Sequence, residues 1–255
     1  MFSDLQGRIA MVTGGARGLG YQMATALARY GVDIALLDLL PEVGESAQRL
    51  ASAAGVRAIG LTADVTDEAS LAAATTAVVE EMGTPSILVN SAGVTVWGES
   101  AEIPAAEWRK VIDINLTGTF LTCQAFARAV FAAGGTGTVV NISSMSGFVV
   151  NIPQTQASYN ASKAAVDQLT RSLAVEWIGK GIRLNAVAPG YFRSQMTRQF
   201  LEQNTELGTY WTGLIPAGRM GEPEDLDGLV TFLASDASRY IVGESIVIDG
   251  GYSLV

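Results

Sequence analysis

Seven short apolar runs alternate with longer amphipathic stretches from one end of the 255-residue chain to the other. The runs are continuous and rich in Val and Ile, which is typical of strands that are covered on both faces. They comprise residues 9–12, 32–37, 56–61, 87–89, 138–142, 182–187 and 245–248. This alternation predicts an α/β fold with a doubly wound, mostly parallel seven-stranded sheet and helices on both faces.

The stretches between these runs have the spacing of helices. Residues 19–28 place apolar side chains on one stripe, residues 69–81 are rich in alanine, and residues 161–177 repeat apolar side chains every four positions. We find no Pro/Gly/Ser-rich linker and no internal repeat, so residues 1–255 are predicted to form one domain. A stretch at about 191–220 mixes polar and aromatic residues, and we expect it to cover a substrate.

Composition excludes several classes of protein. The chain has no histidine and one cysteine, so it cannot contain a Ser-His-Asp triad, an imidazole or zinc site, or an internal disulfide. Its 25 acidic and 16 basic residues leave a net charge of −9, which would repel nucleic-acid phosphates. The N-terminus lacks a basic stretch followed by an apolar core, and no apolar run is long enough to span a membrane. We therefore expect a cytoplasmic protein that binds no metal, nucleic acid or membrane.

A glycine cluster follows the first apolar run. Gly14, Gly18 and Gly20 lie between a predicted strand and a predicted helix, with the spacing Gly-x-x-x-Gly-x-Gly. Glycine lets the backbone approach a ligand closely, and the amides at a helix start attract a pyrophosphate. The pattern indicates a dinucleotide site, although glycines also serve turn geometry alone.

An acidic residue follows the second run. Asp38 occupies the position at which dinucleotide-binding folds place a carboxylate on the adenosine ribose. A carboxylate there disfavours the 2′-phosphate of NADP, so the sequence favours NAD. Arg17 argues in the opposite direction, because a guanidinium can pair with that phosphate. Asp38 has a second interpretation as a helix cap.

Polar and small residues follow the third and fourth runs. Asp64 comes after the third run, and the sequence Asn90-Ser91-Ala92-Gly93 comes after the fourth. Ligands of open α/β sheets bind at the carboxyl ends of strands, so we expect both segments near the cofactor. Asp64 can instead cap the following helix.

The strongest signal is the sequence Tyr159-Asn160-Ala161-Ser162-Lys163. In a helix, the first and last of these residues share a face. A phenol has a pKa of about 10, and a neighbouring ammonium lowers it towards the range of general acid–base work. Such a pair taken alone is also common on ordinary helix surfaces.

Hydroxyl and amide groups are predicted to complete the centre. Ser143, Ser144 and Ser146 follow a strand, and Ser144 is the favoured candidate for bonding a substrate oxygen. These serines can instead satisfy turn backbone. Asn115 interrupts an apolar helical pattern, and its amide either holds a water beside Lys163 or bonds a local carbonyl.

Together these motifs resemble the short-chain dehydrogenase/reductase family over nearly the whole chain. The resemblance is carried by the glycine cluster, residues 90–93, Asn115, Ser144, Tyr159, Lys163, Pro189-Gly190 and Asp249-Gly250-Gly251. It implies a single-domain Rossmann fold that assembles as a homotetramer, often through the two long helices and the C-terminal strand. It also implies hydride transfer between NAD and a secondary alcohol or ketone.

The resemblance assigns a role to each candidate. Tyr159 gives or takes the hydroxyl proton, and Ser144 positions and polarises the substrate oxygen. Lys163 binds the nicotinamide ribose and lowers the pKa of Tyr159, Asn115 holds a water on the proton path, and Ser194 contacts the carboxamide. The implied cofactor-binding residues are Gly14, Arg17, Gly18, Leu19, Gly20, Asp38, Asp64, Val65, Asn90, Ala92, Gly93, Tyr159, Lys163, Pro189, Gly190 and Ser194.

The loop between Ser144 and Tyr159 resembles that of the polyol and sugar dehydrogenases of the family. Its polar side chains can bond further hydroxyls of a polyol or can bond within the loop. The predicted substrate-binding residues are Ser144, Ser146, Asn151, Gln156, Tyr159 and Tyr191. Aromatic candidates for an apolar part of the pocket are Trp97, Phe148, Tyr191, Phe192 and Trp211.

The leading hypothesis is an NAD-dependent dehydrogenase of a polyol or another secondary alcohol. A broad ketone reductase and a 3-oxoacyl-thioester reductase are the enzyme alternatives, although the acidic carrier of the latter disfavours a chain of charge −9. A dinucleotide-sensing binding protein is the alternative from another class. The complete set of Asn115, Ser144, Tyr159 and Lys163 argues against this last reading.

Overall fold

The first strand, an inner strand of the sheet, shows why the chain folds in layers. In the computed structural model, which describes residues 2–194, 197 and 201–255, β1 spans Ile9–Thr13. Ala10 and Val12 belong to one apolar cluster, and Met11 between them belongs to a second cluster. Successive side chains of a strand point to opposite faces, so the sheet is buried on both sides.

All seven predicted strands are confirmed, each within two residues of its predicted ends. After β1 they are β2 (Asp33–Asp38), β3 (Ala58–Thr62), β4 (Ile87–Asn90), β5 (Gly137–Ile142), β6 (Ile182–Pro189) and β7 (Ser245–Ile248). They form one sheet in the order β3-β2-β1-β4-β5-β6-β7, and every neighbouring pair is parallel. The strand order reverses between β1 and β4, which is where open α/β sheets bind ligands.

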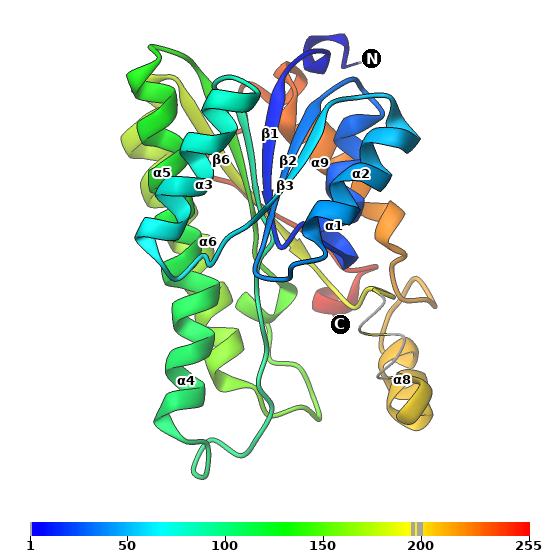
Figure 1. Cartoon of the computed structure of the whole chain (residues 1–255). Coiled ribbons are helices and arrows are strands. Elements are labelled where there is room, and N and C mark those ends of the chain that lie inside the picture. Colours follow the sequence, from blue (N-terminus) through cyan, green and yellow to red (C-terminus); the bar gives the residue numbers. More distant parts are fainter. Residues whose placement is uncertain (1, 195–196, 198–200) are drawn as a thin grey trace.

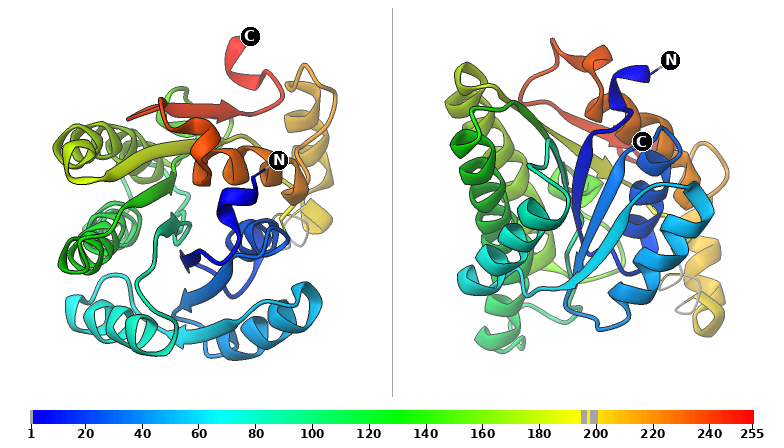
Figure 2. Two further views of the ribbon diagram at one scale, coloured as in Figure 1. Left: turned by 90° about the horizontal axis from the view of Figure 1, so that it is seen from above. Right: turned by 45° about the horizontal axis from the view of Figure 1, so that its top comes forward.

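Helices cover both faces of this sheet. On one face lie α1 (Gly18–Ala28), α2 (Val43–Ala54) and α9 (Asp227–Ala234); on the other lie α3 (Glu68–Glu81), α5 (Gly118–Ala132) and α6 (Ala157–Trp177), as Figures 1 and 2 show. The three helices predicted from spacing are confirmed as α1, α3 and α6, which begin one to four residues earlier than expected. The result is a single-domain α/β fold with a doubly wound parallel sheet.

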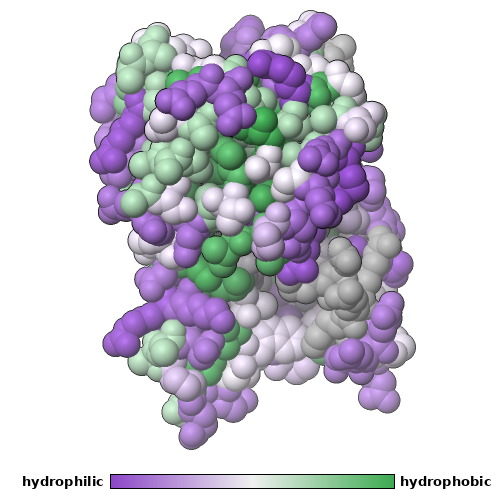
Figure 3. All heavy atoms as spheres, viewed as in Figure 1, coloured by the Kyte–Doolittle hydropathy of each residue, from purple (hydrophilic) through white to green (hydrophobic). Residues whose placement is uncertain are grey.

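Two helices extend beyond the carboxyl ends of the strands, on opposite sides of the sheet (Figure 1). They are α4 (Ala105–Ile112) and α8 (Thr205–Gly213), the latter within the predicted substrate-covering stretch. A small apolar cluster that includes Met145, Trp211 and Tyr252 joins α8 to the body of the protein. In the space-filling view the surface is hollowed between these two projections (Figure 3).

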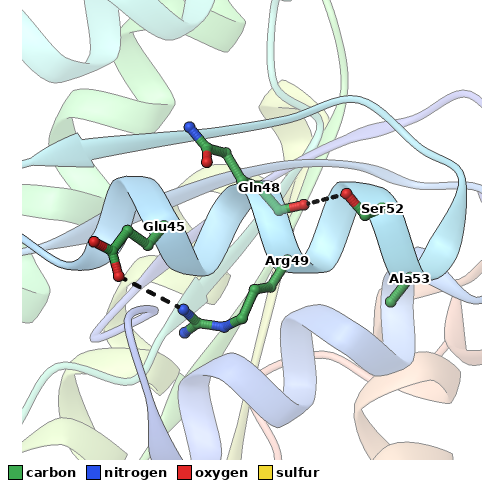
Figure 4. Close-up of a pocket in the computed structure, with 5 residues that line it drawn as sticks. All are labelled: Glu45, Gln48, Arg49, Ser52 and Ala53. Carbon is green, nitrogen blue, oxygen red and sulfur yellow. Dashed lines mark hydrogen bonds and ion pairs between the residues drawn. The ribbon is translucent and has the colours of Figure 1, made fainter.

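A shallow hollow of about 600 Å³ is lined by α2 alone, where Glu45 and Arg49 form an ion pair of 4.0 Å (Figure 4). Because one exposed helix supplies its whole lining, this hollow brings no groups together from different parts of the fold. Within the described ranges, no helix is long and apolar enough to cross a membrane, and no cluster of three or more acidic or cysteine side chains is arranged to hold a metal ion.

Candidate active site

Two side chains one helical turn apart form the centre of the site. Tyr159 and Lys163 lie near the start of α6, with the Lys163 Nζ 5.6 Å from the centre of the Tyr159 ring. Tyr159 is partly exposed, whereas Lys163 is buried. The ammonium donates a hydrogen bond of 2.7 Å to the carbonyl oxygen of Ile142, the last residue of β5. Helical spacing thus brings the pair together, and β5 holds the amine in place.

Burial dominates the proton affinities of this pair. It raises the pKa of the Tyr159 phenol above its ordinary value, and a hydrogen bond with Ser144 opposes that rise. It lowers the pKa of the Lys163 ammonium to about 8, and the Asp167 carboxylate opposes this fall. In the protein alone the pKa of Tyr159 is therefore raised, whereas the sequence predicts a net lowering. The physical reason is that desolvation of the phenolate outweighs the groups that favour it.

The three candidate serines have separate structural roles. Ser144 hydrogen-bonds Tyr159, and its Oγ also accepts a bond of 3.1 Å from the Ser146 amide. Ser143 donates instead to the carbonyl oxygen of Lys163 at 3.1 Å, which fastens the turn after β5 to α6. Of the three, Ser144 is the serine whose hydroxyl meets the Tyr159 phenol.

Asn115 lies in a π-helical turn, Asp113–Thr117, between α4 and α5. Its buried amide accepts a bond of 2.8 Å from the Val94 N–H and donates at 2.9 Å to the Val94 carbonyl. It also donates at 3.0 Å to Ser162, which is in α6 between the two central residues. A π turn widens the helix locally and is common at functional sites. Asn115 therefore joins the segment after β4 to α6, and the carbonyl that it bonds is not a local one.

The glycine turn after β1 is shaped for a close approach of backbone segments. Gly14 has a φ of +63°, and a Cβ there would lie 2.9 Å from the Cα of Ala92. A Cβ at Gly20 would lie 2.2 Å from the Gly14 carbonyl oxygen. Gly18 also has a φ of +63°, and a Cβ on it would meet nothing within 4 Å. The start of α1 follows an extended, exposed Arg17 that makes no capping hydrogen bond through its side chain, so this helix start suits a pyrophosphate.

Asp38 connects the end of β2 to this turn. One carboxylate oxygen accepts a hydrogen bond of 3.0 Å from the Ala16 amide, and the other accepts one of 3.0 Å from the Leu40 amide. The cap interpretation is wrong, because α2 begins five residues later, at Val43. The carboxylate is partly exposed and lies beside the proposed pyrophosphate turn.

Asp64, in the segment after β3, does not cap the following helix. The Asp64 carboxylate bonds the Thr66 amide at 2.8 Å and the Thr66 hydroxyl at 2.7 Å. Asp67 caps α3 instead, accepting from its first amides. Val65 packs against the start of α5, because a Cβ at Gly118 would lie 2.7 Å from its side chain.

A buried ladder of polar side chains, which sequence reasoning did not predict, supports the segment after β4. Thr13 accepts hydrogen bonds from the Ser91 and Ala92 amides at 3.2 and 3.3 Å. Asn90 donates to the amide oxygen of Asn141 at 2.9 Å, and Asn141 donates at 2.9 Å to Thr170 of α6. The side chain of Asn90 is thus engaged in the interior of the sheet.

The same ladder holds the single cysteine of the chain. Asn90 donates to the Cys123 Sγ at 3.2 Å, and burial raises the pKa of this thiol to about 12. A thiol with so high a pKa stays protonated at neutral pH and is a poor nucleophile. Cys123 is a core residue of α5.

The Pro189-Gly190 segment ends β6 against β7. A Cβ at Gly190 would lie 2.6 Å from the Cβ of Asp249, so only glycine fits this contact. Further on, Ser194 shares a hydrogen bond of 3.0 Å with the Thr197 hydroxyl. Both segments lie at the carboxyl edge of the sheet, downstream of β6.

The polar residues of the loop between Ser144 and Tyr159 bond one another. Ser146 donates to the Asn151 oxygen at 2.5 Å, and Asn151 donates to the Tyr191 hydroxyl at 3.2 Å. Gln156 donates to Asn160 at 3.0 Å and lies within hydrogen-bond distance of both Ser146 and Asn151. Ser146, Asn151 and Gln156 are all buried. The structure thus shows the loop-internal bonding that the sequence left open beside substrate binding.

The aromatic candidates fall into three groups by their packing. Tyr191 stacks on Trp211 with ring centres 4.5 Å apart, and Trp97 packs edge-on against Trp211 at 6.0 Å. Phe148 is largely exposed in the loop. Phe192 is a core residue rather than a wall residue, because it is buried in the main cluster beside α1 and α9.

Comparisons with known proteins agree with this geometry. The family model described as "Enoyl-(Acyl carrier protein) reductase" matches residues 14–253. A galactitol 2-dehydrogenase (L-tagatose-forming) of Cereibacter sphaeroides is 43% identical over 98% of this chain and 96% of its own. A probable NADP-dependent mannitol dehydrogenase of Yarrowia lipolytica is 39% identical over 98% of this chain and 88% of its own.

A solved structure extends the likeness to three dimensions. The short-chain type dehydrogenase/reductase from Mycobacterium marinum superposes with a TM-score of 0.92 at 38% identity, covering 98% of this chain and 97% of that one. The agreement reaches from the glycine turn to the last strand, and thus includes every segment of the site. The chain belongs to the short-chain dehydrogenase/reductase family.

Proposed function

We propose that this protein is an NAD-dependent dehydrogenase that interconverts a polyol, or a related secondary alcohol, and the corresponding ketose or ketone. The observation that carries the proposal is the contact of Ser144 and Lys163 with Tyr159 at the carboxyl edge of the sheet, beside the glycine turn. A phenol bonded to a hydroxyl and packed on an ammonium is equipped for proton transfer.

Each residue of the site has its own role in the proposed reaction. The nicotinamide cofactor supplies or accepts the hydride. Tyr159 gives its proton to the carbonyl oxygen in reduction and takes the hydroxyl proton in oxidation. Ser144 positions that oxygen, and Lys163 favours the phenolate and binds the nicotinamide ribose. Asn115 holds a water that passes protons onward from Lys163.

The proposed cofactor residues form the edge described above. The glycine turn, with Arg17 and Leu19, surrounds the pyrophosphate, and Asp38 accepts bonds from the adenosine ribose. The other proposed contacts are Asp64, Val65, Asn90, Ala92, Gly93, Pro189, Gly190 and Ser194. Two observations support pyrophosphate binding at this turn: a Cβ at Gly18 would meet nothing within 4 Å, and no side chain caps the start of α1.

Asp38 supports NAD over NADP, and its replacement gives a direct prediction. We expect Asp38→Ala to reduce the ratio of kcat/KM with NAD to kcat/KM with NADP by about 10- to 100-fold, the scale of a lost charged hydrogen bond. The physical reason is that the ribose loses an acceptor and the 2′-phosphate loses a repulsive carboxylate. Initial rates with both cofactors measure the ratio.

Asp38→Asn is the matched variant, because it removes the charge and keeps an oxygen for the Ala16 or Leu40 amide. It should reduce the ratio as well, with less loss of stability. An unchanged ratio in both variants would show that Asp38 does not touch the ribose. The mannitol relative named above as NADP-dependent makes this measurement the decisive one for cofactor choice.

The polyol assignment is supported by the galactitol and mannitol dehydrogenases among the relatives. Ser144, Ser146, Asn151, Gln156, Tyr159 and Tyr191 are the proposed substrate-binding residues, and the stretch at 191–220 covers the substrate. Oxidation of NADH with a panel of ketoses and simple ketones tests the assignment. Activity on ketoses supports it, activity on simple ketones or 3-oxoacyl thioesters alone favours the reductase alternatives, and tight NADH binding without turnover favours a sensor.

We also propose that the protein is a cytoplasmic homotetramer. Phe120 of α5 and Val247 of β7 are each 36% exposed. These apolar side chains lie on the elements through which the family resemblance predicts assembly. Light scattering coupled to gel filtration should give four times the chain mass of 26.7 kDa; a monomeric mass would contradict the proposal.

A further inference from the structure

Tyr159, Lys163 and Asp167 occupy successive turns on one face of α6. Side chains spaced four residues apart in a helix have Cβ atoms about 6 Å from each other. Asp167 is 3% exposed, and no step of the proposed reaction uses it. Aspartate is rarely buried without a partner of opposite charge. The position of this carboxylate therefore requires an explanation.

The surroundings of Asp167 satisfy only half of its carboxylate. Oδ1 accepts a hydrogen bond of 2.6 Å from Ser245 of β7. Oδ2 is buried and has no hydrogen-bond partner within the described part of the chain. A Cβ at Gly147, in the turn after Ser144, would lie 2.8 Å from Oδ2, so this turn packs directly on the carboxylate. Asp167 thus lies where β7, α6 and the Ser144 turn meet.

A buried oxygen without a partner carries a desolvation cost, which a nearby cation can offset. Two cations flank Asp167 on α6, each one turn away: Lys163 and Arg171. Arg171 is exposed, so solvent and salt screen its charge. Lys163 is buried, and its charge therefore acts on Asp167 through a medium of lower dielectric.

The proton affinities of the two groups agree with this geometry. Burial lowers the pKa of Lys163, and the Asp167 carboxylate opposes this fall. Burial raises the pKa of Asp167, and the Ser245 and Ser143 hydroxyls oppose this rise most, followed by the charges of Arg171 and Lys163. The other elements packed on the pair contribute neutral groups. The Ile142 carbonyl accepts from the ammonium, the Ser245 hydroxyl donates to the carboxylate, and the Ser143 hydroxyl lies near the carboxylate but donates to the Lys163 carbonyl.

We propose that Asp167 is a positioning residue that keeps the Lys163 amine charged and thereby sets the upper limit of the pH range in which Tyr159 can donate its proton. The inference rests on the proposed function of Tyr159 and Lys163. It adds a third member to their helix face, one that acts through Lys163 and does not touch the substrate.

The isosteric variant Asp167→Asn tests the proposal. Removing the negative charge makes the Lys163 ammonium easier to deprotonate, so the charge that stabilises the phenolate formed when Tyr159 donates its proton is lost at a lower pH. We expect the alkaline limb of kcat/KM for ketone reduction to move down by about one pH unit, the effect of a charge one helical turn away at intermediate dielectric. The affinity for NADH at pH 6 should stay within about twofold of the parent protein.

Asp33→Asn is the charge-matched control. Asp33 pairs with Arg57 at the amino end of β2, at the opposite edge of the sheet, so its removal should leave the pH limb in place. If Asp167 only stabilises the fold, Asp167→Asn should have a lower melting temperature and a lower rate at every pH. The alkaline limb of its kcat/KM profile should then stay at the same pH as in the parent protein. That result would overturn the proposal.

A measurement that does not depend on turnover or on the stability of Asp167→Asn completes the test. In the protein labelled with ¹³C at aspartate carboxyls, the Asp167 signal should titrate at higher pH after Lys163→Met, because the ammonium no longer favours the carboxylate. An unchanged titration would refute the coupling. If the Asp167 titration moves but the parent protein reduces no ketone, the proposed reaction is wrong. The charge coupling between Lys163 and Asp167 is then still supported.

Discussion

Replacing Tyr159 with phenylalanine is expected to lower kcat by roughly 10²- to 10⁴-fold, the usual contribution of a general acid or base. The variant removes one oxygen, which in the structure bonds Ser144 and carries the reacting proton in the proposed mechanism. The ring would still pack beside Lys163, and the glycine turn would be unchanged. NADH should therefore bind with its original affinity, which fluorescence titration measures, while steady-state rates report the loss.

Tyr240→Phe is the matched control, since Tyr240 is fully exposed and distant from the centre in the sequence. It should have the parent rate. Retention of more than about a tenth of the activity by Tyr159→Phe would mean that another group transfers the proton. Loss of NADH binding by the same variant would show that the phenol serves the cofactor rather than the chemistry.

The sequence predicted the layers of this fold because its strands are covered on both sides. Burial on two faces requires apolar side chains at every position, and such runs stand out between amphipathic helices. Residues 87–89 illustrate the point, since they are predicted as a strand and form β4, whose four residues are all buried. The contact between Tyr159 and Lys163 was predictable for a similar reason, because helical periodicity alone places them together.

The groups that could not be predicted act across the sheet. Thr13, Asn90 and Asn141 belong to three different strands, and no periodicity relates them. Their hydrogen bonds exist only because β1, β4 and β5 are neighbours in a particular register, in which Asn90 pairs with both Thr13 and Asn141. The order of strands is a property of the whole fold, so the partners of a buried amide do not follow from its local sequence.

The loop between Ser144 and Tyr159 shows a second limit of prediction from sequence. Ser146, Asn151 and Gln156 have the polarity expected of groups that bind hydroxyls, and the structure places them in a buried network with one another. Side-chain chemistry is the same in both roles, and only the path of the backbone distinguishes them. The net pKa of Tyr159 was missed for a related reason, because the degree of burial is set by tertiary packing.

The glycine turn provides the second prediction of large effect. In Gly20→Ala, the new methyl group would lie 2.2 Å from the Gly14 carbonyl oxygen and 2.9 Å from its carbonyl carbon. Both atoms are backbone, so no side-chain rotation can relieve the overlap, and the turn itself must move. Since this turn is proposed to surround the pyrophosphate, we expect NADH affinity to fall by about 100-fold or more.

Gly228→Ala is the matched control for this substitution. Gly228 lies in the first turn of α9, and a Cβ there would meet nothing within 4 Å. That variant should bind NADH normally and melt at the same or a slightly higher temperature, because alanine is the better helix former. Isothermal titration of both variants separates a local effect on the turn from a general effect of added methyl groups. Parent-like NADH affinity in Gly20→Ala would show that the pyrophosphate does not depend on the path of this backbone, and the cofactor would then have to bind elsewhere on the carboxyl edge.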